Sequence, residues 1–104
     1  MKTIRLSVLE RLLLPELLPC QGGKIEMLLC DSIVRQVEFS AHEISDFGLR
    51  DGGDGNVSWT NSVEVGFEFT AEQVEVLKNA SKKADEGKMV SRQNLTLIVK
   101  IDSL

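Results

Sequence analysis

Hydrophobic positions recur every three or four residues from Lys24 to Glu38, and this period predicts an amphipathic helix. The same period runs from Thr70 to about Glu86 and ends at Gly87, a residue that commonly stops helices. The positions that face inward in the first helix are Ile25, Leu28, Leu29, Ile33, Val34 and Val37, and in the second Val74, Leu77, Ala80 and Ala84. We expect these two helices to form much of the core.

Three capping boxes, in which Ser or Thr is followed three residues later by Glu or Gln, predict helix starts. They are Ser7–Glu10, Ser40–Glu43 and Thr70–Gln73. The first predicts a short helix over Val8–Leu14 that stops at Pro15, since proline lacks the N–H that a helix interior needs. The second predicts a short helix that ends at Gly48.

Alternation of apolar and polar residues predicts a β-hairpin after the third helix. Its strands are residues 56–59 and 63–69, joined by a three-residue loop. This loop pairs Trp59 with Val63 and Val57 with Val65, which places the apolar residues on one face.

Two alternatives remain open near the end of the sequence. A weak helix start at Ser91 predicts a last helix of about ten residues. The segment Thr96–Ile101 is rich in β-branched residues, however, and is also typical of a strand.

The order of these elements predicts one α+β domain over residues 1–104, with four to five helices and one hairpin. The helix over Lys24–Glu38, the tight joint after it and the next short helix resemble a helix-turn-helix, with the hairpin as a wing. The predicted architecture is therefore winged-helix-like.

Charge changes this picture. From Glu38 to Glu75 there are nine acidic residues and one basic residue, whereas from Lys78 to Lys100 there are six basic and two acidic. A helix that reads DNA needs basic residues against the phosphates, and the predicted recognition helix has none, so duplex DNA is a disfavoured partner. The acids instead suggest contact with a basic partner, although a plain solvated surface is the alternative. The candidate partner-binding residues are Glu43, Asp46, Glu64 and Glu68, with Trp59 as an apolar anchor.

Candidate chemistry is sparse. Cys20, Cys30 and the lone histidine, His42, do not form a zinc-binding set, and Cys30 is expected to be a buried thiol. The loop Asp51–Asn56 lacks the ligand spacing of an EF-hand. We therefore expect no cofactor, no metal and no enzymatic activity. No apolar run approaches the roughly 18 residues that a membrane span needs, so a cytoplasmic location is expected.

The chain also resembles a group of small phage and prophage proteins. The resemblance rests on Glu10-Arg11-Leu12-Leu13 with Leu17-Leu18-Pro19, on Phe39-Ser40-Ala41-His42-Glu43 with Gly48-Leu49, on Trp59, on the helix from Thr70, and on Glu86-Gly87-Lys88-Met89-Val90. It carries over no catalytic residues and implies a phage accessory protein made inside a bacterium.

These observations lead to a functional expectation. The chain is expected to be a small binding protein, such as an inhibitor of bacterial antiviral defence that covers a host protein or sequesters a signalling nucleotide. A winged-helix-like transcription regulator is the alternative, and a virion component is a third. Free hairpin edges favour a homo-oligomer.

Overall fold

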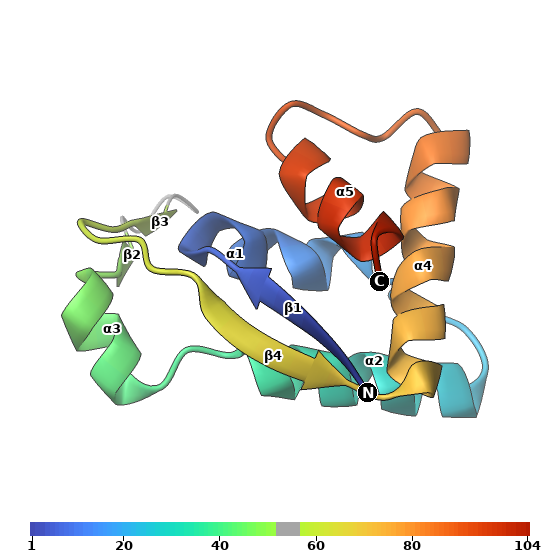
Figure 1. Ribbon diagram of the computed structural model, residues 1–104, viewed down its shortest axis with the longest axis horizontal. Coiled ribbons are helices and arrows are strands. Elements are labelled where there is room, and N and C mark those ends of the chain that lie inside the picture. The colour runs from blue at the N-terminus through green and yellow to red at the C-terminus, as the bar shows by residue number, and fades with distance from the viewer. Residues whose placement is uncertain (52–56) are drawn as a thin grey trace.

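The computed structural model describes residues 1–51 and 57–104. Figure 1 shows a two-stranded sheet, β1 and β4, among helices, with α4 and α5 at one end of the molecule and α3 at the other. The elements in chain order are β1 (Lys2–Leu6), α1 (Val8–Leu17), α2 (Lys24–Val37), α3 (Ala41–Phe47), β2 (Arg50–Asp51), β3 (Val57–Ser58), β4 (Val65–Phe69), α4 (Ala71–Glu86) and α5 (Leu95–Asp102). The predicted α+β class, with mostly helical elements, is confirmed.

The main sheet pairs the two halves of the chain. β1 runs antiparallel to β4, with Lys2 opposite Phe69 and Leu6 opposite Val65. Ile4 and Leu6 alternate with exposed residues, and Leu6 and Phe69 are fully buried. β1 was not predicted from the sequence, because five residues with two inward positions give too short an alternation to indicate a strand.

The predicted β-hairpin is wrong. β3 pairs with β2, with Arg50 opposite Ser58, and not with β4. The segment expected to form the tight loop is tied to α3 instead, since the backbone N–H groups of Thr60 and Asn61 donate to the carbonyl of Phe47 at 2.8 and 3.1 Å. The strands therefore do not form the wing that the winged-helix-like order required. The loop Asp51–Asn56, for which we expected no calcium site, lies largely outside the described residues.

All three capping boxes form as predicted, each with both of its hydrogen bonds. α3 ends at Gly48, whose left-handed φ of 64° suits glycine. α1, however, does not stop at Pro15 but continues to Leu17. Only two residues follow the proline, so the disruption is confined to the last turn, where Leu14 and Leu18 are buried on either side of it.

The core lies where β1 and β4 meet α1, α2, α4 and α5. α4 buries the residues that its period predicted, including Leu77 and Ala80. α2 buries Ile33 and Val37 but leaves Ile25 and Leu28 exposed, so its predicted apolar stripe is not covered at the start of the helix. The helical alternative near residue 95 is correct, because Leu97, Ile98 and Ile101 of α5 bury one face.

Side chains from two flanking helices donate hydrogen bonds to backbone carbonyls of the main sheet. Lys100 Nζ on α5 donates to the Arg5 carbonyl of β1 at 2.8 Å, and Gln36 Nε2 on α2 donates to the Glu68 carbonyl of β4. These bonds occupy part of the backbone that a neighbouring strand would need for pairing. Across residues 1–51 and 57–104, no helix has the length and apolarity to cross a membrane.

Candidate functional site

Glu43, one of the predicted contact residues, points into the molecule. Its carboxylate accepts from the guanidinium of Arg11 at 2.7 and 3.1 Å, and Arg11 is 2% exposed. The hydrogen bond from Arg11 lowers the pKa of Glu43 to about 2, and the backbone N–H of Ser40 adds to this effect. Glu43 is therefore committed to an internal ion pair.

Arg11 joins three parts of the chain. Its Nε donates to the Val37 carbonyl at 3.1 Å and its Nη2 to the Glu38 carbonyl at 2.8 Å. Its guanidinium carbon lies 4.0 Å from the ring centroid of Phe39 and 5.0 Å from that of Phe67. Arg11 therefore links α1 to the end of α2 and to α3, and its role is structural.

Glu64 is exposed, but its carboxylate is also paired within the chain. Lys100 Nζ donates to the carboxylates of both Glu64 and Glu10, at 2.7 Å in the second case. Burial opposes charge on Glu10, but hydrogen bonds from Lys100 and Ser7 outweigh it and leave the pKa of Glu10 below its usual value. The Oε2 of Glu10 is buried and has no hydrogen-bond partner in the described part of the chain.

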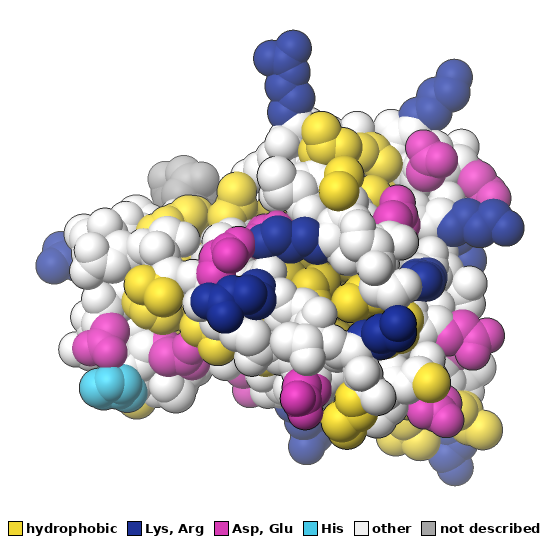
Figure 2. All heavy atoms as spheres, viewed as in Figure 1, with side chains coloured by type: hydrophobic (Ala, Val, Ile, Leu, Met, Phe, Trp, Pro, Cys, Tyr) yellow, Lys and Arg dark blue, Asp and Glu magenta, His cyan; other side chains and the backbone are white. Residues whose placement is uncertain are grey.

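The remaining predicted residues do not converge. Asp46 pairs with His42 at 2.9 Å on the exposed surface of α3, Glu68 is exposed on β4, and Trp59 is half-buried after β3. Figure 2 shows acidic and basic side chains interspersed over the face that carries the main sheet. The acidic residues expected to form one contact surface are thus partly neutralised and scattered.

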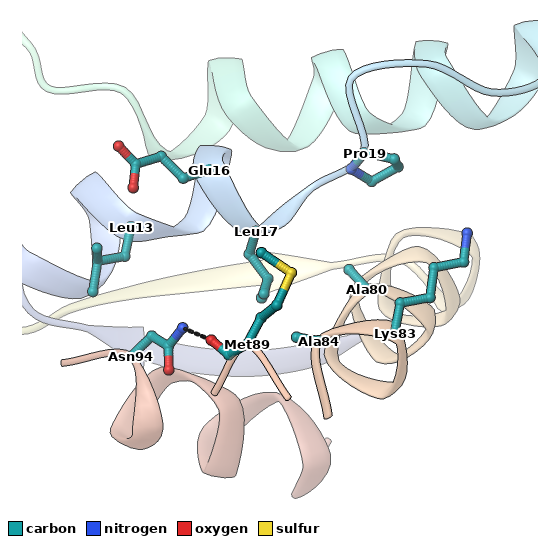
Figure 3. Close-up of a pocket in the computed structure, with 9 residues that line it drawn as sticks. All are labelled: Leu13, Glu16, Leu17, Pro19, Ala80, Lys83, Ala84, Met89 and Asn94. Atoms are coloured by element: carbon teal, nitrogen blue, oxygen red, sulfur yellow. Dashed lines mark hydrogen bonds between the residues drawn. The ribbon is translucent and has the colours of Figure 1, made fainter. Parts of the chain in front are cut away.

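A hollow elsewhere on the molecule has the shape of a binding site. It has a volume of about 300 Å³ and lies between α1 and α4, near the connection that leads to α5 (Figure 3). Leu13 and Leu17, one turn apart on α1, form one wall, and Ala80 and Ala84, one turn apart on α4, form the other. We call this hollow the α1–α4 groove.

Met89 stands at the mouth of the α1–α4 groove. In Figure 3 its side chain extends between Leu17 and Ala84, and it is 72% exposed. Its position is fixed by the end of α4, where the N–H of Met89 donates to the Ala84 carbonyl at 2.8 Å and that of Lys88 to the Asp85 carbonyl at 3.1 Å. This pattern is a Schellman motif, which normally places glycine in the left-handed conformation.

Here the left-handed residue is Lys88, with a φ of 55°. α4 ends before Gly87 as predicted, but that glycine takes an ordinary φ of −83°. A side chain in the left-handed region costs on the order of 1 kcal/mol. The chain therefore holds Met89 at the groove through a local conformation that disfavours stability.

Two opposite charges stand at the rim of the α1–α4 groove. Glu16 lies on the α1 side and Lys83 on the α4 side, and Figure 3 shows them on either side of the hollow. Both are exposed, and neither has an ion-pair partner within residues 1–51 and 57–104. Both charges are therefore available to a bound molecule.

The lining of the α1–α4 groove is mainly aliphatic, with one carboxylate, one ammonium and one amide among its side chains. Its remaining lining residues are Pro19 and Asn94, and Asn94 Nδ2 donates to the Met89 carbonyl at 3.3 Å. Among the described residues, no three His, Cys, Asp or Glu side chains lie close enough to hold a metal ion. Cys20 and Cys30 are free thiols, and burial raises the pKa of Cys30, as expected for an inert core thiol.

Sequence reasoning missed this groove because no motif marks it. It placed Ala80 and Ala84 correctly on the inner face of α4, and their small side chains leave the space that Leu13 and Leu17 do not fill. No protein-family model, curated protein or solved structure shows significant similarity to this chain.

Proposed function

We propose that this chain is a non-enzymatic binding protein that receives part of a bacterial host protein in the α1–α4 groove. The observation that carries the proposal is the apolar hollow of about 300 Å³ beneath an exposed methionine. Methionine is flexible and polarisable, which suits a surface that must adapt to a partner. The resemblance to small phage proteins makes a host factor in the bacterial cytoplasm, such as a component of antiviral defence, the expected class of target.

Three local features that oppose stability support a functional role for this region. Pro15 lies inside α1, and Glu16 places a negative charge at the negative end of the α1 dipole. Lys88 adopts a left-handed conformation next to Met89. Locally unfavourable conformations and charges of this kind cluster at functional sites. They persist there because the rest of the fold is stable enough to compensate for their cost.

A protein partner suits the groove better than a nucleotide. The phosphates of a nucleotide require several donors, whereas Lys83 and Asn94 face mainly aliphatic side chains here. The DNA-binding alternative has less support, since the strands meant to form a wing pair elsewhere and α3 presents Asp46.

The test is capture from a bacterial lysate followed by measurement with the purified target. Ala84→Leu fills the groove, and Met89→Glu places a charge at its mouth on a side chain already 72% exposed. A protein bound by the wild type should lose at least about tenfold in affinity with either variant. Glu75→Lys, on an exposed part of α4 outside the groove, is the control and should leave the affinity unchanged.

Two results would contradict the proposal. One is a captured protein that binds both groove variants as tightly as the wild type. The other is a rise in the unfolding midpoint with adenine or cyclic nucleotides, which would identify a nucleotide ligand. The expected homo-oligomer stays a prediction, and light scattering on the purified protein tests it.

A further inference from the structure

We infer that two copies of this chain associate through the outward side of α2, with the two α2 helices antiparallel across a twofold axis near Leu28. The inference does not depend on the α1–α4 groove. It rests on where the exposed apolar and charged side chains lie along α2, and on how that arrangement pairs with a copy of itself.

One side of α2 faces solvent from Lys24 to Arg35. At about 100° per residue, steps of four, three and four residues stay on the side opposite the core-facing residues. We call these positions the outward row of α2, and its members are Lys24, Leu28, Asp31 and Arg35, all of them exposed. Ile25 stands beside the row and is 74% exposed, and Leu28 is 61% exposed. The start of α2 therefore presents two large apolar side chains to solvent among charged ones.

The position of α2 leaves the outward row open to a second molecule. In Figure 1, α2 runs along the lower edge of the molecule, with the main sheet, α1 and α5 above it. Because the core lies above α2 in this view, the outward row points away from the rest of the chain. Figure 2 shows hydrophobic side chains at the surface along this lower edge.

The charges of the outward row match a second copy of the same row. Lys24 precedes Leu28 by four residues, about 6 Å along the helix, and Asp31 follows it by three, about 4.5 Å. When a second α2 runs antiparallel and the two Leu28 side chains meet, each Lys24 lies opposite Asp31 of the other copy. A parallel pair would place Lys24 against Lys24, and like charges repel. The charges thus select both the occupant and its direction.

Lys24 and Asp31 are both available for this contact. Lys24 pairs with no acidic side chain in the described part of the chain. Asp31 lies 3.0 Å from Arg35 Nε, but its side chain is 58% exposed and a carboxylate can accept from two cations. The result is a twofold contact in which the same surface serves both copies. Because it involves one short helix from each copy, we expect a weak dimer that dissociates on dilution.

Sedimentation velocity tests the dimer directly. The wild type should pass from monomer to dimer as its concentration rises from about 5 µM to about 1 mM. Leu28→Ser should weaken the dimer at least about tenfold, because two leucine side chains are no longer buried. Lys24→Glu and Asp31→Lys should each weaken it about tenfold, since two attractive pairs become repulsive. All three positions are exposed, so the variants should keep the circular dichroism spectrum of the wild type.

An equimolar mixture of Lys24→Glu and Asp31→Lys separates pairing between copies from effects within one chain. Each variant repels its own copy. In the mixed dimer, however, the introduced glutamate faces the introduced lysine, and the original Lys24 faces the original Asp31. The mixture should therefore dimerise within about threefold of the wild type. Lys78→Glu and Glu75→Lys carry the same changes of charge at exposed positions of α4, and alone or mixed they should dimerise like the wild type.

Three results would overturn the inference. One is a wild type that stays monomeric at about 1 mM. Another is a dimer that Leu28→Ser leaves equally tight, and the third is a mixture of the two charge variants that is no tighter than either alone. None of these results bears on the proposed function, because Ala84→Leu and Met89→Glu test that by capture of a host protein and lie outside α2.

Discussion

At the scale of single residues, Arg11 does the most to connect distant parts of the chain. Its guanidinium is stacked by Phe39, bonded to two carbonyls of the α2 end and paired with Glu43. A buried cation is stable only when its hydrogen bonds and its counter-charge are supplied together. Glu43, which the sequence suggested as a contact for a binding partner, is therefore the counter-charge that Arg11 needs.

This pairing predicts a pH dependence of stability. Glu43 has a pKa of about 2 in the folded protein against an ordinary value of 4.5, so its contribution is complete above pH 4.5 and fades as the pH falls toward 2. Glu43→Gln should lower the free energy of unfolding by about 2 kcal/mol at pH 7. In urea titrations at pH 2.5, the gap between wild type and variant should largely close.

Glu68→Gln is the matched control, since Glu68 is exposed and forms no ion pair with the described residues. It should leave the stability nearly unchanged at both pH values. If the wild type and Glu43→Gln differed in free energy of unfolding by the same amount at pH 2.5 as at pH 7, the ionised Glu43 carboxylate would not be the source of that difference.

The two cysteines predict a reactivity difference. Cys20 is exposed, whereas Cys30 is 4% exposed and has a raised pKa. Because the thiolate is the reactive form, Ellman's reagent should modify one thiol per native chain quickly and the second only on unfolding. Cys20→Ser should abolish the fast phase, and fast modification of both thiols would contradict the assigned burial of Cys30.

At the scale of elements, the features set by residues close together in the sequence were predicted correctly, and those set by distant residues were not. Helix starts depend on residues three apart, and Ser7, Ser40 and Thr70 all cap helices as predicted. Strand pairing depends on residues that are distant in the sequence. We predicted that β4 pairs with the preceding strand in the sequence, β3, but it pairs with β1. The groove depends on three separate segments, and no local signal describes it.

The end of α4 makes a prediction at this scale. Lys88→Gly relieves the left-handed strain, so it should raise the free energy of unfolding by about 0.5–1 kcal/mol in chemical denaturation. Lys78→Gly, at an exposed position inside α4, should lower it by about 1 kcal/mol, because glycine disfavours helix interiors. A loss of stability with Lys88→Gly would mean that the lysine side chain makes a contact that outweighs the strain.

At the scale of the whole molecule, α3 and the β2–β3 pair form one end, away from α4 and α5 (Figure 1). Arg11 and the Phe39–Phe47 contact, with ring centroids 6.3 Å apart, are prominent side-chain links between this end and the core. Such a region can open without global unfolding when its few tethers are weakened.

Arg11→Met should therefore act unevenly across the molecule. Amide hydrogen exchange in α3 should become faster by more than the change in α4, because the ion pair and its carbonyl bonds are lost at one end only. Arg35→Met removes an exposed pair with Asp31 on α2 and should leave both rates nearly unchanged. Equal acceleration in α3 and α4 would show that the molecule opens as one unit.

The pairing of β1 with β4 has a consequence for synthesis. β1 leaves the ribosome before β4, and roughly 60 residues separate the paired positions, so at a synthesis rate of about 5–20 residues per second β1 waits for its partner on the order of 3 to 12 seconds. During that interval Ile4 and Leu6 have no strand to cover them. The nascent chain thus completes its central sheet late, and its earliest apolar residues are open to chaperones until then.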